Sequence, residues 1–388
     1  MRILLLSDFA LPDSCADATR VINFARILKA LGHETVLLGV SYKNDAPLSG
    51  EYRGIPYTML KAKPYYGIHA FKRIRHLSHD IEEHLKSAPV YDAILLSNFY
   101  YDHMRVLGKY AKKHNARLII NALEWFDRKN PHFSGMVGKI HFLKNRIALK
   151  HIFVKSKNIL AISSLLDDYY HKRGCNTVTI PTIIDLAEYQ DLLSTKKDDT
   201  KIRIAYAGSP GKKDYILNAL YALEFLNEDE LERIEFHFYG PKKENLFSLG
   251  MTSDFLTRYE KNIVCHGRIP YAEVKHRIAE ADFTILLRPQ RRYANAGFPT
   301  KVGESMTCGT PVIANLTSDI GKYLQDGENG IVCENETPKA CAVALKKALL
   351  LTDEEKTNMR AKAFSTAEVG FNYLAYTEAL QVFLDHCI

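Results

Sequence analysis

Short hydrophobic runs alternate along the chain with amphipathic stretches whose apolar residues recur at helical spacing. The run "RILLLSD" (2–8) is followed by the amphipathic stretch "ATRVINFARILKALGHE" and then by a second run, "TVLLGV". A strand, a helix and a strand within about 40 residues are typical of a right-handed crossover unit with parallel strands. Three further strands are expected in this half, at 92–98, 116–122 and 158–163, and the segment 176–189 would close it.

A charged segment with almost no apolar residues, "LSTKKDDTK" (193–201), separates this block from a second one. The alternation then restarts, and most of its short apolar runs end in Gly or Pro; they are 202–208, 234–240, 262–267, 283–289 and 310–315. Alternating strands and helices predict parallel sheets, and two such blocks predict two doubly wound α/β domains. The expected division is a first domain over 1–192, a linker over 193–201, a second domain over 202–370 and a terminal helix over 371–388.

Length and composition fit a two-domain globular protein. A chain of 388 residues suits two domains of about 150–200 residues each, and its 46% hydrophobic and 25% charged content is ordinary for globular proteins. No apolar run approaches the roughly 18 residues of a membrane span, and Asp8 ends the N-terminal run before a signal peptide could form. The seven cysteines are scattered and never form C-x-x-C, so we expect a reducing cytoplasm, with neither a disulfide framework nor a zinc site.

Positive charge is concentrated in the first half of the chain. Residues 1–190 hold 27 Lys and Arg against 17 Asp and Glu, whereas the remainder holds 25 against 28. Two windows, 52–79 and 128–166, contain no carboxylate but carry six and eight cations, respectively. A basic face implies a polyanionic partner, which could be nucleic acid, anionic lipid headgroups or a pyrophosphate-bearing substrate. A solvated basic surface without a partner accounts for the charge alone equally well.

Chemistry-bearing residues of the second half lie in loops that directly follow predicted strands, where ligands bind in open α/β sheets. The loop "AGSPGKKDYI" (207–216) combines glycines, which allow close backbone approach, with Lys212, Lys213 and a helix start. This combination suits a phosphate group, and a plain turn with surface lysines is the alternative. The loop has neither G-x-x-x-x-G-K-[ST] nor G-x-G-x-x-G spacing, which disfavours a mononucleotide kinase and a dinucleotide oxidoreductase.

Three more loops carry charged residues. Arg268 follows a short strand, and Arg288 ends an apolar run, where a guanidinium needs an anionic ligand or a carboxylate within the domain. Lys301 and Glu304 lie in "AGFPTKVGESMTCGTPVIAN" (296–315), next to a Gly-Phe-Pro turn. Glu304, at an expected helix start, is either a charge that compensates the helix dipole or an acceptor for the two vicinal hydroxyls of a ribose.

The segment "FPTKVGESMTCGTPVIAN…DIGKYLQDGENGIVC", with "AYAGSPGKKDYILNAL" upstream, resembles the donor half of a family 4, retaining, GT-B glycosyltransferase. In the first half, "ATRVINFARILKALGHETVLLG" and "ILAISSLLDDYYHKRGCNTVTIPTIID" are similar to the same family. The resemblance covers most of the chain, is most specific over 297–330 and is nearly absent over 40–115. It implies two Rossmann-like domains that face each other across a cleft, and a C-terminal helix that could cross back to the first domain.

The resemblance also implies roles for particular residues. Lys213, with Lys212 as the alternative, would meet the diphosphate of a nucleotide-sugar, and Glu304 would bind the ribose. Backbone amides from Gly297 to Thr300 would hold sugar hydroxyls or phosphate. The expected donor-binding residues are Ser209, Lys212, Arg268, Gly297, Phe298, Pro299, Thr300, Lys301 and Glu304.

Four positions depart from the family pattern. The first glutamate of the E-x7-E motif is Ala296 here, and the arginine that usually follows the glycine after the first strand of the second domain is Ser209. The glycine pair of the first loop is missing from "PDSCADATR", and the usual histidine segment reads "NALEWFD". We hypothesise that Arg288 or Lys301 replaces the missing cation and that Glu124 takes the acceptor-side role. Lys213, Arg288 and Glu124 are therefore the expected catalytic residues.

These features together predict an enzyme that transfers a sugar, with retention, from a nucleoside-diphosphate sugar to a glycan or a lipid-pyrophosphate-linked acceptor in polysaccharide or glycoconjugate biosynthesis. No cofactor or obligatory metal is expected, because lysine and arginine can stabilise the diphosphate leaving group. A nucleotide-sugar epimerase, disfavoured by Ala296, and a non-catalytic GT-B-like binding partner are the alternatives. No nucleic-acid module is recognisable. The basic windows predict peripheral attachment to an anionic membrane, at the inner face of the plasma membrane.

Overall fold

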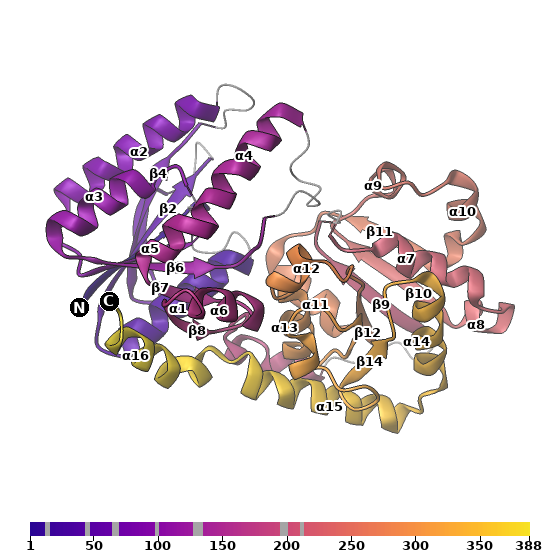
Figure 1. Cartoon of the computed structure of the whole chain (residues 1–388). Coiled ribbons are helices and arrows are strands. Elements are labelled where there is room, and N and C mark those ends of the chain that lie inside the picture. The colour runs from indigo at the N-terminus through magenta and orange to yellow at the C-terminus, as the bar shows by residue number, and fades with distance from the viewer. Residues whose placement is uncertain are drawn as a thin grey trace. The chain divides into compact units, whose positions relative to one another are not determined.

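The computed structural model describes residues 1–11, 16–42, 47–63, 70–97, 101–126, 135–194, 201–209 and 213–388. The chain forms two compact units, one made of Met1–Ile183 with Tyr373–Ile388 and the other of Ile184–Asn372 (Figure 1). Each unit is an α/β structure around one mainly parallel sheet. The fold class expected from the alternating pattern is therefore confirmed.

In the described part of the chain the first sheet has eight strands. In spatial order they are β3 (Ser49–Tyr52), β4 (Ile55–Lys61), β2 (Glu34–Ser41), β1 (Arg2–Ser7), β5 (Ala93–Ser97), β6 (Arg117–Ala122), β7 (Asn158–Ala161) and β8 (Asn176–Thr179). Only β3 runs antiparallel to its neighbour. The central strands β1 and β5 are buried along almost their whole length. This explains why they appear in the sequence as continuous apolar runs, as expected for parallel strands covered on both faces.

Helices connect these strands and cover the sheet. They are α1 (Ala16–Ala30), α2 (Ala70–Ser87), α3 (Met104–His114), α4 (Gly135–Ile147), α5 (Phe153–Ser156) and α6 (Ser164–His171), with a π-helical turn at Ala148–Ile152 between α4 and α5. The chain returns to this unit at its C-terminal end, where α16 (Thr377–Asp385) lies beside β8. The Asn176 side chain donates a hydrogen bond to the carbonyl oxygen of Phe383 at 2.9 Å. The C-terminal helix thus belongs to the N-terminal unit.

Among the residues that the structure describes, the second sheet has six strands, and their pairs are all parallel. In spatial order they are β11 (Ile263–Gly267), β10 (Ile234–Tyr239), β9 (Ile202–Ala207), β12 (Phe283–Leu286), β13 (Val312–Asn315) and β14 (Gly330–Cys333). The helices of this unit are α7 (Ile216–Tyr221), α8 (Glu228–Glu232), α9 (Lys243–Ser248), α10 (Ser253–Arg258), α11 (Tyr271–Ala279), α12 (Arg292–Ala296), α13 (Thr300–Thr307), α14 (Pro338–Leu350) and α15 (Asp353–Gly370). The strand β14 was not expected from the sequence.

The boundary between the units differs from the expected position at residue 192. The chain enters the second unit at Ile184, and Leu192 is buried there against Ile278 and Cys308. The chain therefore enters the second unit eight residues before the expected boundary. None of the described helices combines the length and hydrophobicity that a membrane-spanning helix requires.

Two glycines bring the ends of β9 and β10 into close contact. Gly208 and Gly240 have φ angles of +129° and +122°, which side chains rarely tolerate. The Gly208 amide donates to the carbonyl oxygen of Tyr239 at 2.8 Å. A Cβ atom on Gly240 would lie 2.4 Å from the carbonyl oxygen of Gly208. The loop after β9 can therefore occupy this place only if residue 240 has no side chain.

We expect Gly240→Ala to destabilise the second unit by roughly 1–3 kcal/mol more than Gly250→Ala, measured by urea denaturation. Gly250 is the matched control because it also has a positive φ, +111°, yet no atom lies within 4 Å of a Cβ placed there. Equal losses of unfolding free energy in the two variants would show that the close approach to Gly208 has no energetic importance.

Candidate functional site

A buried carboxylate, that of Asp214, lies at the centre of the charged loops of the second unit. Its Oδ1 accepts a hydrogen bond from Nε of Arg288 at 2.7 Å, and its Oδ2 accepts one from Nζ of Lys301 at 2.9 Å. The Tyr206 hydroxyl donates to Oδ2 at 2.9 Å. Arg288 is 7% exposed and so is Asp214. Three side chains from β9, from the loop after β12 and from α13 thus converge on one carboxylate.

The electrostatics of this cluster keep the carboxylate charged. Burial by itself raises the pKa of Asp214, but the Lys301 ammonium and the Arg288 guanidinium outweigh it and hold the pKa well below the ordinary value. Burial, reinforced by Asp214, raises the pKa of Tyr206, which therefore stays a neutral donor. Two cations around one carboxylate leave the cluster with a net positive charge.

Arg288 is also fixed through its backbone. Its amide donates to Oδ1 of Asn315 at 2.9 Å, and its carbonyl oxygen accepts from Nδ2 of Asn315 at 2.8 Å. Asn315 is the last residue of β13, so one carboxamide joins the carboxyl ends of β12 and β13. The sequence left open whether Arg288 meets an anionic ligand or a carboxylate within the domain. The structure pairs it with the carboxylate of Asp214, and the sequence pointed to neither Asp214 nor Asn315. The available signal was the aspartate directly after Lys213, in a loop otherwise rich in glycine and lysine.

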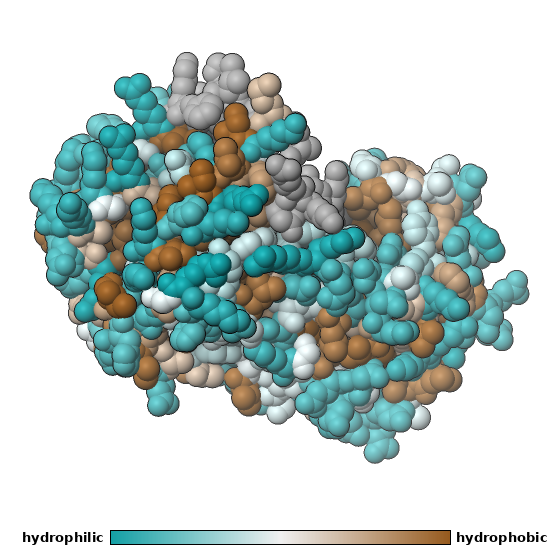
Figure 2. All heavy atoms as spheres, in the orientation of Figure 1, coloured by the Kyte–Doolittle hydropathy of each residue, from teal (hydrophilic) through white to brown (hydrophobic). Residues whose placement is uncertain are grey.

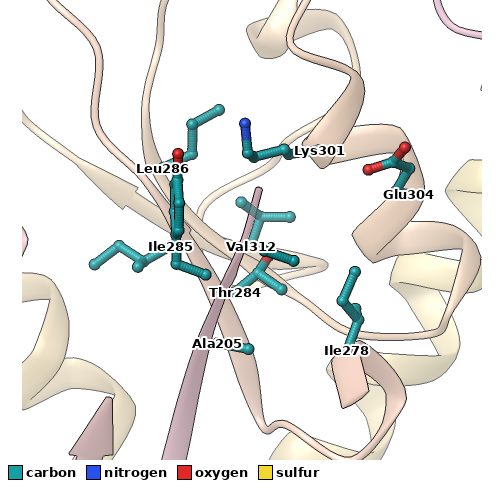
Figure 3. A pocket seen from close by; sticks show the side chains of 10 residues that line it. Ala205, Ile278, Thr284, Ile285, Leu286, Lys301, Glu304 and Val312 are labelled. Carbon is teal, nitrogen blue, oxygen red and sulfur yellow. The ribbon is translucent and has the colours of Figure 1, made fainter. Parts of the chain in front are cut away.

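Lys301 and Glu304 line a narrow pocket next to this cluster (Figure 3). Figure 3 shows the Lys301 side chain extending from α13 toward Leu286, with Glu304 farther along the same helix. The Lys301 side chain also packs against the backbone of Gly208, directly after β9. A Cβ atom placed on Gly208 would lie 2.9 Å from Cε of Lys301. The pocket wall thus holds one cation, Lys301, and one carboxylate, Glu304, among mainly apolar residues.

Glu304 does not lie in the first turn of its helix. The helix α13 begins at Thr300, so its first turn holds no acidic residue, and Glu304 follows one turn later. The sequence placed the helix start at Glu304, which is wrong, because Pro299 ends the preceding loop and Thr300 already begins the helix. This position disfavours the alternative in which Glu304 only compensates the helix dipole, since that effect falls off within the first turn.

The turn before α13 is packed into the core of the unit. Gly297, Phe298 and Pro299 are buried, whereas Thr300 is half-buried. The Phe298 ring contacts the rings of Tyr323 and Phe371, with centroids 5.4 Å and 5.7 Å away. The Phe298 side chain therefore anchors the turn to the core. A donor-binding role for this turn would have to use its backbone amides.

The remaining expected residues occupy different places. Ser209 is exposed directly after Gly208, Lys213 is half-buried next to Asp214, and Arg268 is exposed after β11. Glu124 follows β6 in the N-terminal unit and is half-buried. Lys212 lies outside the described residues. Lys213, Asp214, Arg288, Lys301 and Glu304 are thus assembled in one unit, and Glu124 belongs to the other.

Ala296, at the position of the missing family glutamate, is fully buried at the end of α12. Within the described residues, no cluster of three or more His, Cys, Asp or Glu side chains could hold a metal ion. The site that the structure assembles is therefore made of cations, one buried carboxylate and the half-buried Glu304.

Part of the chain is similar in sequence to known glycosyltransferases. Residues 191–366 match the family described as "Glycosyl transferases group 1". Two uncharacterized glycosyltransferases of Methanocaldococcus jannaschii are 22% and 24% identical to this chain, over 57% and 71% of its length. These matches cover 55% of the first relative and 82% of the second.

A likeness to solved structures extends over the whole chain. The crystal structure of HepE from Anabaena in complex with UDP and glucose is 14% identical, with a TM-score of 0.65, and 100% of each chain is covered. At this level of identity the likeness concerns the fold alone. The chain thus has the GT-B fold of glycosyltransferases, and its residues 191–366 match the group 1 glycosyl transferases.

Proposed function

We propose that this protein is a retaining glycosyltransferase that uses a nucleoside-diphosphate sugar as donor and a glycan or a lipid-pyrophosphate-linked molecule as acceptor. The observation that carries the proposal lies in the part of the chain that matches group 1 glycosyl transferases. Arg288 and Lys301 meet there at Asp214, and Lys301 shares a pocket with Glu304. A structural neighbour, HepE, was crystallised with UDP and glucose, which supports a nucleotide-sugar donor.

The cations suit the chemistry of the leaving group. Breaking the bond between the anomeric carbon and the diphosphate passes through an oxocarbenium-like state, and negative charge builds up on the departing diphosphate. Preorganised positive charge stabilises that state without reorganisation during the reaction. Arg288 donates its Nε–H to Asp214, and its guanidinium carries further N–H donors that suit phosphate oxygens. In this proposal Asp214 is a positioning residue that fixes the direction of two cations.

Glu304 suits the nucleoside part of the donor. A half-buried carboxylate one turn into α13 has two oxygens, which can accept hydrogen bonds from two vicinal hydroxyls of a ribose. The role of Glu124 on the acceptor side stays a prediction. Glu124 follows β6 of the N-terminal unit and is half-buried.

A panel of nucleotide-sugars tests the proposed function. The panel consists of UDP-, GDP-, ADP- and dTDP-sugars at millimolar concentration. We expect at least one of them to raise the melting temperature of the protein, because a ligand that binds the native state stabilises it by mass action. The same donor should be hydrolysed slowly and consumed faster with an acceptor extract. Binding without any turnover would favour the non-catalytic alternative, and formation of an epimeric nucleotide-sugar would favour the epimerase. If no member of the panel binds, the proposed function is wrong.

Lys213→Ala is expected to lower kcat about 100- to 1000-fold and to change the Michaelis constant of the donor much less. The reason is that a cation at the diphosphate stabilises the transition state more than the ground state. Steady-state kinetics with the donor found above measure both constants, and Lys212→Ala is the matched control. A larger loss of kcat in Lys212→Ala than in Lys213→Ala would assign the role to the other lysine.

A further inference from the structure

The helix α4 of the N-terminal unit exposes a line of large apolar side chains. Met136, Ile140, Leu143 and Ile147 are 80%, 42%, 58% and 36% exposed. Their spacings of four, three and four residues place them within about 60° of one another around the helix. Single exposed hydrophobic residues are common on protein surfaces, whereas a continuous apolar face on one helix marks a surface that contacts another phase or molecule.

Cations flank this apolar line. Lys139 and Arg146 are exposed, and their spacing of seven residues places both on the same side of the line. Figure 2 shows hydrophobic and hydrophilic side chains next to each other over α4. The whole stretch from residue 128 to residue 166 contains no carboxylate, so no acidic residue of this stretch neutralises the two cations.

Lys144 holds the helix in place. Its Nζ lies 2.6 Å from Oδ1 of Asp102, and both side chains are about four-fifths buried, with exposed fractions of 20% and 22%. Lys144 is one of the eight cations of the window 128–166, but it forms an ion pair within the unit, whereas Lys139 and Arg146 are exposed. Directly after α4, Ala148 and Leu149 are buried, so the end of the helix is attached to the unit while its apolar line faces outward.

We propose that α4 docks on the surface of an anionic lipid bilayer, with Met136, Ile140, Leu143 and Ile147 inserted among the acyl chains near the headgroups. An amphipathic helix with apolar residues on one side and Lys or Arg at its flank lies in the membrane interface in this way. The cations favour anionic headgroups, and salt weakens that attraction. The excess of positive charge in the first half of the chain gives the same preference for a negative surface. This inference does not depend on the sugar-transfer activity proposed above.

Vesicle co-sedimentation of the full chain tests the proposal. The probes are vesicles of phosphatidylcholine alone and vesicles that also contain about one third phosphatidylglycerol. The apolar variant is Met136→Gln with Leu143→Gln, because glutamine keeps helix propensity, and the charge variant is Lys139→Glu with Arg146→Glu. The matched controls are Leu350→Gln with Val369→Gln, which are 81% and 78% exposed in the other unit, and Lys112→Glu with Lys113→Glu on α3.

The wild type is expected to bind anionic vesicles at low salt at least about tenfold better than neutral ones, and each α4 variant should lose about tenfold or more of that affinity. Both controls should lose much less affinity than the α4 variants do. The proposal is overturned if anionic vesicles bind no more protein than neutral ones, or if the control variants lose as much as the α4 variants. It is also overturned if the α4 variants merely convert a dimer into a monomer in light scattering, because the face would then serve a second copy of the chain.

Thermal shift with the nucleotide donor separates this proposal from the proposed function. The α4 variants should keep the melting temperature of the wild type and its increase with donor. If the α4 variants lose vesicle binding but keep the increase of melting temperature with donor, the α4 surface serves membrane binding and not donor binding. Donor binding that disappears in the α4 variants would contradict a separate docking surface.

Discussion

Asp214→Asn is expected to lower the melting temperature of the second unit by roughly 6–20 °C. The substitution keeps the shape of the side chain but leaves Arg288 and Lys301 facing a neutral amide in a buried place. Removing one partner of a buried ion pair costs about 3–5 kcal/mol, because the remaining charge has lost both water and its counter-ion. In a unit of this size each kcal/mol corresponds to about 2–4 °C. Differential scanning calorimetry is the measurement.

The control for this variant is Glu328→Gln, which removes the carboxylate of a surface pair with Lys362. Both side chains of that pair are 57% exposed, and we expect a change within about 0.5 kcal/mol. A similar melting temperature for Asp214→Asn and Glu328→Gln would mean that water already screens the Asp214 cluster.

The pH dependence of the same variant has a definite sign. The pKa of Asp214 is lower in the folded protein than the ordinary value of about 3.9 in the unfolded chain. The carboxylate therefore contributes its full stability above about pH 5 and loses it as the pH falls through the folded pKa. The difference in unfolding free energy between wild type and Asp214→Asn should stay constant from pH 5 to about pH 8 and shrink only below about pH 4. A difference that instead grows with acidification would contradict an ionised Asp214.

Glu304→Ala is expected to weaken binding of the nucleotide-sugar donor about 10- to 150-fold with little change in the melting temperature. A charge-assisted hydrogen bond is worth about 1.5–3 kcal/mol, and this converts to the stated range of affinity. The fold should tolerate the change, because Glu304 is half-buried and lies in the middle of a helix, where alanine is favourable. Isothermal titration calorimetry with the donor, or with UDP alone, gives the dissociation constant.

Glu273→Ala is the matched control for Glu304→Ala. Glu273 is an exposed glutamate on α11, the helix that also contributes to the pocket wall through Ile278. Its removal should leave donor affinity unchanged. An unchanged dissociation constant in Glu304→Ala as well would give Glu304 a structural role in α13 and remove it from the donor site.

Part of the site could be predicted because strand ends are visible in the sequence. The apolar runs at 202–208, 283–289 and 310–315 correspond to β9, β12 and β13, so the loops after them were recognised as candidate ligand loops. Gly208, Lys213, Arg288, Lys301 and Glu304 all lie in or after these loops. The start of α13 was misplaced, because the sequence does not show where the buried turn around Phe298 ends and the helix begins.

The sequence by itself determined the two α/β blocks. A parallel strand that is buried on both faces appears as a continuous apolar run, whereas a helix that is buried on one face has apolar residues at helical spacing. Only the tertiary structure decided which charges meet. Arg288 and Lys301 are 74 and 87 residues away from Asp214 along the chain. Their pairing depends on the strand order β9–β12–β13, which local patterns do not encode. The return of α16 to the first unit and the outward direction of the apolar line on α4 were decided in the same way, because each depends on which surfaces the rest of the chain covers.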